Sequence, residues 1–186
     1  MTTRIGAVSA EADTRAAWPR AATMARLRPV LTRPEFFSAA EIAAMSALAA
    51  RFPSKPARMV DGMSSSAFIG TETWLRAGTE WIAARLAEIA PDLAMEIPKI
   101  VSYPVGGLFA WHTDRGSPTR RIAISLQLSP PDDYTGGELL IMEPETHMAD
   151  RGLGSLIAFD PLAKHGVAPV TAGERRALVT WLHEER

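Results

Sequence analysis

The segment "GSLIAFDPLAKHGVAPVTAGERRALVTWL", residues 154–182, decides the fold class of this chain. It holds three short runs rich in aliphatic residues, at 154–160, 165–170 and 176–182, and Pro161 and Gly173 lie in the stretches between them. Short runs bounded by proline and glycine are typical of β-strands. We therefore expect the C-terminal part of the chain to be built from strands.

Four similar runs come before this segment. They lie at 97–103, 108–114, 121–129 and 137–142, again separated by glycine, proline and aspartate. Many short strands at this spacing favour a sandwich or a barrel. A jelly roll with two helices packed outside its double sheet satisfies the pattern. The predicted fold is mainly β with supporting helices, in the α+β class.

The two helices are expected in the first half of the chain. Ser38 and Glu41 have the spacing of a capping box, and Pro53 stops the helix that follows. A second helix is predicted at about Thr79–Ile89, before Pro91. The residues expected to face inward are Ile42, Met45, Leu48 and Phe52 on the first helix, and Trp81, Ile82, Leu86 and Ile89 on the second.

Composition limits the classes of protein and of site. The chain has 186 residues, a formal net charge of -1, 47% hydrophobic and 22% charged residues, which fits one globular domain with its own core. The near-zero charge argues against a nucleic-acid surface. There are no cysteines, so any metal must be held by His, Asp or Glu. Neither a secretory signal nor a run of membrane-span length is present, and we expect a cytoplasmic protein with no membrane partner.

Domain boundaries follow from the same patterns. Residues 1–33 are predicted to be a loosely ordered extension, although their six arginines leave a targeting peptide or a basic arm open. Residues 34–186 are expected to form a single domain, with helical support at 34–96 and the jelly-roll core at 97–186. The polar stretch 54–70 is a candidate lid over the substrate or an ordinary surface connection.

His112 and Asp114 are the first candidate metal ligands. Residues i and i+2 of a strand face the same side, so both side chains can point into the jelly roll. The same alternation places Phe109, Trp111 and Thr113 on the opposite side. A polar pair at the end of a strand would look the same, so a third ligand is needed to distinguish the two.

His165 can supply that third ligand, because it begins a strand, whereas His147 and His183 are expected to be solvated. Arg175 follows His165 by ten residues, across a turn at 171–173 that would make their strands antiparallel neighbours. Two histidines and one carboxylate form the facial triad that binds iron(II) and leaves coordination positions open. Iron(II), Asp114, a dicarboxylate cosubstrate and Arg175 would together be neutral, which a buried pocket tolerates.

Three motifs in order carry a resemblance to a known family. They are "YPVGGLFAWHTD" (103–114), "RRIAISLQLSPPDDYTGGEL" (120–139) and the segment at 154–182. Here the chain resembles the iron(II)/2-oxoglutarate-dependent oxygenase superfamily, in its prolyl 4-hydroxylase-like branch. The resemblance implies a double-stranded β-helix, the cupin-like jelly roll, with His112, Asp114 and His165 on iron and Arg175 on the distal carboxylate of 2-oxoglutarate.

Three further residues are candidates for binding the cosubstrate. By the resemblance, Tyr103 lies near 2-oxoglutarate, although a core tyrosine would fit equally well. Gln127 shares a strand face with Ala123 and Ser125, and this face lines either the pocket or the outer surface. Trp181 shares a face with Arg175, so it either walls the pocket or packs in the core. Asp160 is expected to be a surface or turn residue.

The reaction implied by the resemblance is the hydroxylation of an aliphatic C–H with oxygen and 2-oxoglutarate, which yields succinate. Ascorbate would serve as an accessory reductant. The substrate would be a prolyl or other amino-acid residue in a peptide or protein, or a free amino acid. Two alternatives remain. One is a non-catalytic cupin-like metal- or ligand-binding protein, which would not need Arg175. The other is a nucleic-acid-directed oxygenase, which would bind oligonucleotides in a salt-sensitive way. The sequence predicts no oligomeric state.

Overall fold

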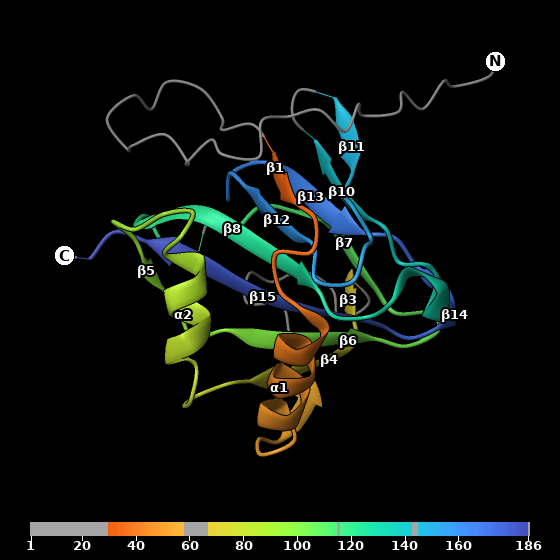
Figure 1. Cartoon of the computed structure of the whole chain (residues 1–186). Coiled ribbons are helices and arrows are strands. Elements are labelled where there is room, and N and C mark those ends of the chain that lie inside the picture. The colour runs from red at the N-terminus through yellow and green to blue at the C-terminus, as the bar shows by residue number, and fades with distance from the viewer. Residues whose placement is uncertain (1–29, 58–66, 115, 143–144, 186) are drawn as a thin grey trace.

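In the computed structural model, residues 30–57, 67–114, 116–142 and 145–185 are described. Two antiparallel sheets face each other, and two helices cover the outer side of the larger one (Figure 1). The larger sheet runs in the order β1 (Leu31–Arg33), β12 (Leu156–Phe159), β8 (Arg120–Gln127), β15 (Arg175–His183), β6 (Lys99–Tyr103), β4 (Thr71–Trp74) and β2 (Ser54–Pro56), with β5 (Ala94–Met95) beside β15.

The smaller sheet lies opposite β8, β15 and β6. Its order is β11 (Thr146–Met148), β10 (Leu139–Met142), β13 (Lys164–Val167), β7 (Leu108–His112) and β3 (Phe68–Ile69). A separate pair, β14 (Val170–Gly173) and β9 (Tyr134–Gly136), with the 3-10 turn η2 (Pro131–Asp133), lies at one end. This arrangement of two facing sheets is the predicted jelly roll.

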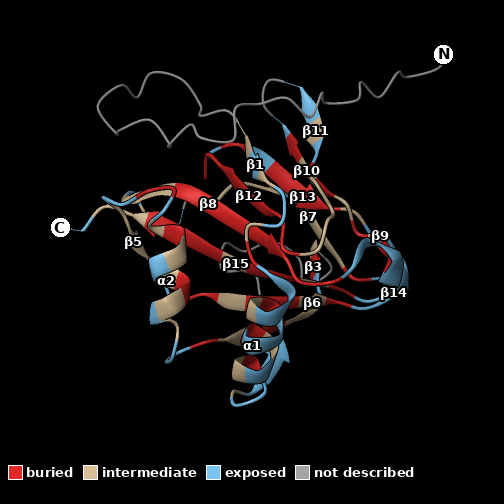
Figure 2. Cartoon of the chain, in the orientation of Figure 1, coloured by how far each residue is buried: buried red, intermediate tan, exposed pale blue. Residues whose placement is uncertain are grey.

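The buried residues lie mainly on the strands of the two facing sheets (Figure 2), and strand alternation divides them between two cores. On β8, Ile122, Ile124 and Leu126 pack toward the helices, whereas Ala123 faces the space between the sheets. On β15, Leu178 packs toward the helices in the same way. The side chains facing the smaller sheet are therefore free to line a cavity, while the opposite face builds the helix-side core.

Both helices form where the sequence predicts them. The N-terminus of α1 (Ala39–Ala49) has the full capping box of Ser38 and Glu41. Helix α2 (Glu80–Leu86) is shorter than the predicted span, and Ile89 is buried just beyond its end. Leu48 and Trp81 are partly buried against the same core rather than fully inside it. The helices thus support the larger sheet on the side away from the cavity.

Three predicted boundaries are wrong. Residues 31–33 are not part of an extension, because they form β1 and pair with β12; residues 1–29 lie outside the described part of the chain. Residues 34–96 are not only helical support, since β2, β4 and β5 belong to the larger sheet. The run 165–170 is two strands, because β13 ends before Pro169 and β14 begins at Val170. Proline cannot donate to a strand ladder, which explains the break.

No helix in the described residues has both the length and the apolar composition needed to cross a membrane.

Candidate metal centre

A cavity of about 740 Å³ lies between the two sheets. Its walls come from the inner faces of β4, β6, β8 and β15 on one side and of β7, β10 and β13 on the other. His112, Asp114, His165, Tyr103, Arg175 and Trp181 all line it. The structure therefore brings together six of the seven residues that the sequence singled out.

The three candidate ligands converge on one point of this cavity. Donor atoms of His112, Asp114 and His165 all lie within 4.8 Å of one another. His112 Nε2 is 3.6 Å from Asp114 Oδ1, and His165 Nε2 is 3.4 Å from Asp114 Oδ2. Cross-strand pairing produces this approach, because His112 on β7 is directly opposite His165 on β13.

Backbone carbonyls fix the orientation of both imidazole rings. Nδ1 of His112 is 2.8 Å from the carbonyl oxygen of Ala110, and Nδ1 of His165 is 2.9 Å from that of Ala163. A carbonyl oxygen can only accept, so each Nδ1 carries a proton and, in the neutral ring, Nε2 has the free lone pair. Burial, followed by the neighbouring His165, lowers the pKa of His112 to about 4. His112 is therefore neutral and ready to ligate at physiological pH.

Asp114 supplies the negative charge of the group. Its backbone N–H donates to the carbonyl of Pro161 over 2.7 Å, and its Oδ2 accepts from the indole Nε1 of Trp181 over 2.8 Å. Burial alone would raise the pKa of Asp114, but His165, Trp181 and His112 together lower it below its ordinary value. Two imidazole nitrogens and one carboxylate oxygen form a donor set that fits iron(II) with open positions.

The turn between β12 and β13 holds two of the ligands in place. Asp160, expected at the surface or in a turn, is in the turn but only 4% exposed. Its Oδ1 accepts from the N–H of Leu162, and its carbonyl accepts from Ala163. Since Pro161 contacts Asp114 and Ala163 contacts His165, this turn positions both ligands. The Asp-Pro pair in the sequence is a turn signal that could have indicated it.

The predicted alternation along β7 is wrong at Phe109. Val167 pairs with Phe109 and His165 with His112, so β7 has one more residue than β13 across the same interval. This irregularity is a β-bulge, and it brings Phe109 and His112 to the same face. The ring of Phe109 stacks on His112 with centroids 3.6 Å apart, while Trp111 points outward and is 38% exposed. Asp114 lies beyond the end of β7, and the expectation for Thr113 is wrong as well, because this residue also lines the cavity.

Arg175 is a buried cation that lines the same cavity as the candidate ligands. It is 2% exposed, and its Nη2 donates to Gln127 Oε1 over 3.0 Å. The predicted antiparallel pairing of the strands of His165 and Arg175 is wrong, because β13 and β15 belong to opposite sheets. Gly137 makes room for the arginine: its φ is +68°, and an added Cβ would lie 3.1 Å from Arg175 Cδ.

Tyr103 and Gln127 both lie next to the side chain of Arg175. Tyr103 is directly opposite Arg175 in the β6–β15 pairing, and the guanidinium carbon lies 5.4 Å from its ring centroid. Burial raises the pKa of the Tyr103 phenol, so it stays protonated. Gln127 does not line the cavity itself. Its side chain lies outside the lining and accepts the hydrogen bond from Arg175.

Sequence reasoning missed a second group of polar residues in the same cavity. Lys99 and Glu72 form an ion pair on β6 and β4, and Arg120 lies with its guanidinium carbon 3.8 Å from the ring centroid of Trp181. Glu72 and Lys99 are far apart in the sequence, so no local spacing signals their contact. The alternation along 97–103, which places Lys99 and Tyr103 on one face, was the available signal.

The remaining sequence candidates lie elsewhere. His147 is on β11 and His183 at the end of β15, and neither lines the cavity; both are half-buried rather than fully solvated. Within the candidate lid 54–70, residues 58–66 lie outside the described part of the chain. Its ends form β2 and β3, and Phe68 lines the cavity.

Comparison with protein families agrees with this geometry. Residues 98–183 match the family model of the 2OG-Fe(II) oxygenase superfamily. A PKHD-type hydroxylase from Parvibaculum lavamentivorans is 38% identical over 84 residues, which are 43% of this chain and 38% of that protein. The chain spans 38% of the length of this curated relative and 54% of the length of a second PKHD-type hydroxylase.

Solved structures show the same fold over most of the chain. A Pseudomonas putida prolyl-4-hydroxylase superimposes with a TM-score of 0.69 at 21% identity and covers 83% of this chain and 92% of its own. A Trichoplax adhaerens prolyl hydroxylase, solved with a hypoxia inducible factor peptide fragment, gives 0.67 at 15% identity, with 83% of each chain covered. These structures share the double-stranded β-helix arrangement.

Proposed function

We propose that this protein, whose residues 98–183 match the family model of the 2OG-Fe(II) oxygenase superfamily, is a 2-oxoglutarate-dependent dioxygenase that hydroxylates an aliphatic C–H bond. With iron(II) bound, the site would activate oxygen, so that 2-oxoglutarate and the substrate become succinate, carbon dioxide and the hydroxylated product. The observation that carries the proposal is the shared cavity of a His112–Asp114–His165 donor set and a buried Arg175.

The ligand roles follow from protonation and orientation. His112 and His165 would bind the metal through Nε2, since the carbonyls of Ala110 and Ala163 occupy Nδ1. Asp114 would bind through one oxygen, while Trp181 holds the other. Contacts of this kind behind the ligands are known to tune metal affinity.

The cosubstrate would occupy the end of the cavity near Arg175. A buried guanidinium can bind a carboxylate with two parallel hydrogen bonds, and it needs a negative partner in a dry site. Gln127 is neutral and uses one N–H of this group, so the charge is left for a ligand. Tyr103, kept protonated by burial, could donate a further hydrogen bond to the same anion.

The substrate class proposed is an amino-acid residue, prolyl or other, in a peptide, in a protein or free. Its support comes from the PKHD-type hydroxylase relatives and from the prolyl hydroxylase structures, one of which was solved with a peptide. The cavity is large enough to hold a cosubstrate and a small side chain together. A nucleic-acid substrate is not favoured, because the net charge of the chain is -1.

The test is succinate formation from 2-oxoglutarate with iron(II), ascorbate and oxygen. The wild-type protein is expected to produce succinate slowly even without substrate, and His112→Ala is expected to produce none. The matched control is His147→Ala, which removes a histidine outside the cavity and should leave the rate unchanged. Equal succinate formation by wild type and His112→Ala would contradict the proposal.

A further inference from the structure

The cavity contains a charged pair that neither the metal nor the cosubstrate needs. Lys99 Nζ contacts Glu72 Oε1, and the two side chains are 13% and 9% exposed. Both residues line the same cavity as the candidate ligands. A buried ion pair contributes little to stability compared with apolar residues of similar size. Stability alone therefore does not account for this pair.

The pair lies at the opposite end of the cavity from Arg175. In the β6–β15 pairing, Arg175 is opposite Tyr103, and Val179 is opposite Lys99. The four-residue interval corresponds to about 13 Å along the strand. A 2-oxoglutarate molecule held by Arg175 at one end and by the metal at the other would occupy the Arg175 end of the cavity. The Lys99 end is thus left to the substrate.

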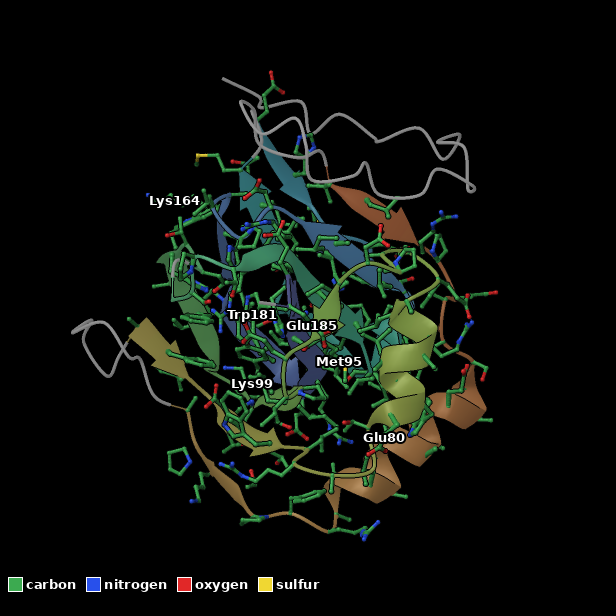
Figure 3. All side chains as sticks on the ribbon, turned by 90° about the vertical axis from the view of Figure 1, so that its left-hand side faces the viewer. Glu80, Met95, Lys99, Lys164, Trp181 and Glu185 are labelled. Atoms are coloured by element: carbon green, nitrogen blue, oxygen red, sulfur yellow. The ribbon has the colours of Figure 1, made fainter. Side chains whose placement is uncertain are left out.

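Lys99 lies close to three aromatic rings of the cavity, and one of these rings contacts a candidate metal ligand. Its Nζ is 5.1 Å from the ring centroid of Trp74, 5.5 Å from that of Trp181 and 5.9 Å from that of Phe68. Lys99 and Trp181 lie side by side in the interior (Figure 3). Trp181 in turn contacts Asp114. A substrate held by Lys99 would therefore have its aliphatic carbons between aromatic rings and beside the metal.

We propose that Lys99 and Glu72 form a subsite for the carboxylate and the ammonium of an α-amino acid with both ends free. This inference rests on the proposed function and names its substrate class. The ammonium of Lys99 has three N–H donors and the carboxylate of Glu72 has two oxygens, so their mutual contact leaves donors and an acceptor for a ligand. An amino acid can lie antiparallel to the pair, with its carboxylate on Lys99 and its ammonium on Glu72.

The charges on the two side chains favour a dipolar ligand over other classes. A simple carboxylate would be repelled by Glu72, and a simple amine would be repelled by Lys99. An internal prolyl residue of a peptide has neither charge, so it would leave the desolvated pair without compensation. Rejecting ligands that leave buried polar groups unpaired is a strong source of specificity. Free amino acids are therefore expected to bind in preference to residues within a chain.

The test is calorimetric binding to the full chain loaded with Mn(II) and 2-oxoglutarate, without oxygen. The probes are the common free L-amino acids, L-proline first, each compared with its N-acetyl, its amide and its doubly blocked form. At least one free amino acid is expected to bind. Each single block is expected to weaken its binding by about 10- to 100-fold, the effect of losing one charge-assisted hydrogen bond.

Two variants assign each end of the ligand. Lys99→Met should abolish the preference for the free amino acid over its amide and retain the preference over the N-acetyl form. Glu72→Gln should do the reverse. The double variant Lys99→Met/Glu72→Gln removes both charges, so no unpaired charge is buried, and it should bind the doubly blocked form at least as well as the free one. Arg76→Met, which removes an exposed cation in the loop after β4, is the matched control and should change nothing.

The outcomes separate this inference from the proposed function. If 2-oxoglutarate binds but no free amino acid does, or if blocked and free forms bind equally, the Lys99–Glu72 subsite is overturned and the oxygenase proposal stands. Preferences that are the same in both single variants would also overturn it. If the metal-loaded protein does not bind 2-oxoglutarate, the proposed function itself fails.

Discussion

Trp181 donates a hydrogen bond to Asp114, with its indole Nε1 2.8 Å from Asp114 Oδ2. On the neighbouring strand β8, Arg120 lies over the same indole and donates to both carboxylate oxygens of Glu96 at 2.7 Å. The candidate metal carboxylate is therefore fixed by an ordered chain of side chains. Because Trp181 and Arg175 lie on the same face of β15, one strand carries both the hydrogen-bond donor to Asp114 and the candidate cosubstrate cation.

Trp181→Phe is expected to weaken metal binding by about tenfold, because the ring remains but the hydrogen bond behind Asp114 is lost. Mn(II) titration by calorimetry measures the effect. Trp81→Phe, in the helix-side core, is the matched control and should leave the metal affinity as it is. An unchanged affinity in Trp181→Phe would show that the indole does not position the carboxylate.

Acid is expected to destabilise the metal-free protein through His112. The pKa of His112 is about 4 when folded and 6.5 in its ordinary state, so the unfolded chain binds the extra proton between these values. The stabilisation by neutral His112 is complete above pH 6.5 and is lost as the pH falls toward 4. Within this window the group contributes a slope of about 1.4 kcal/mol per pH unit.

Urea unfolding of the metal-free protein at several pH values measures this slope. His112→Gln should give a shallower pH dependence between pH 6.5 and 4 than the wild type. The same slope in both proteins would mean that His112 is not buried in its neutral form.

The bulge in β7 predicts opposite outcomes for two neighbouring aromatic residues. Phe109 packs between His112 and Phe68, with ring centroids 3.6 and 4.0 Å away. Phe109→Ala is therefore expected to lower the free energy of unfolding by about 3 kcal/mol. Trp111→Ala, on the outer face, should change it by only about 0.5 kcal/mol. Thermal or urea unfolding compares them, and the reverse order would contradict the bulged register.

Gln127→Leu should weaken 2-oxoglutarate binding by about tenfold, because Arg175 then loses the acceptor that holds its Nη2. The side chain is similar in size, so the fold is expected to be retained. Calorimetry with Mn(II)-loaded protein gives the affinity. A binding constant equal to that of the wild type would remove Gln127 from the cosubstrate site.

Much of this architecture could be predicted where local patterns are regular. The alternation along 121–129 separates Ile122, Ile124 and Leu126 from Ala123, and the structure places them in the two different cores. The Ser38 and Glu41 spacing predicts the capping box that begins α1. These features depend on neighbours within a few residues, which the sequence displays directly.

The missed features depend on long-range pairing. The extra residue in β7 is visible only against β13, so the face of Phe109 could not be read from alternation. Pro169 was visible in the run 165–170 as a break signal, but the assignment of β13 and β15 to opposite sheets depends on their pairing with distant strands. Lys99 meets Glu72 only because β4 pairs with β6.

The central claim is that one cavity binds a divalent metal and 2-oxoglutarate together. Its most direct test is an anaerobic calorimetric titration of Mn(II), followed by 2-oxoglutarate, into the metal-free wild type, His112→Ala, Arg175→Met and the control Arg176→Met. The wild type and Arg176→Met should bind one metal and then 2-oxoglutarate. His112→Ala should lose both, and Arg175→Met should keep the metal but bind 2-oxoglutarate about 100-fold more weakly. Binding of 2-oxoglutarate without metal, or full affinity in Arg175→Met, would contradict the account.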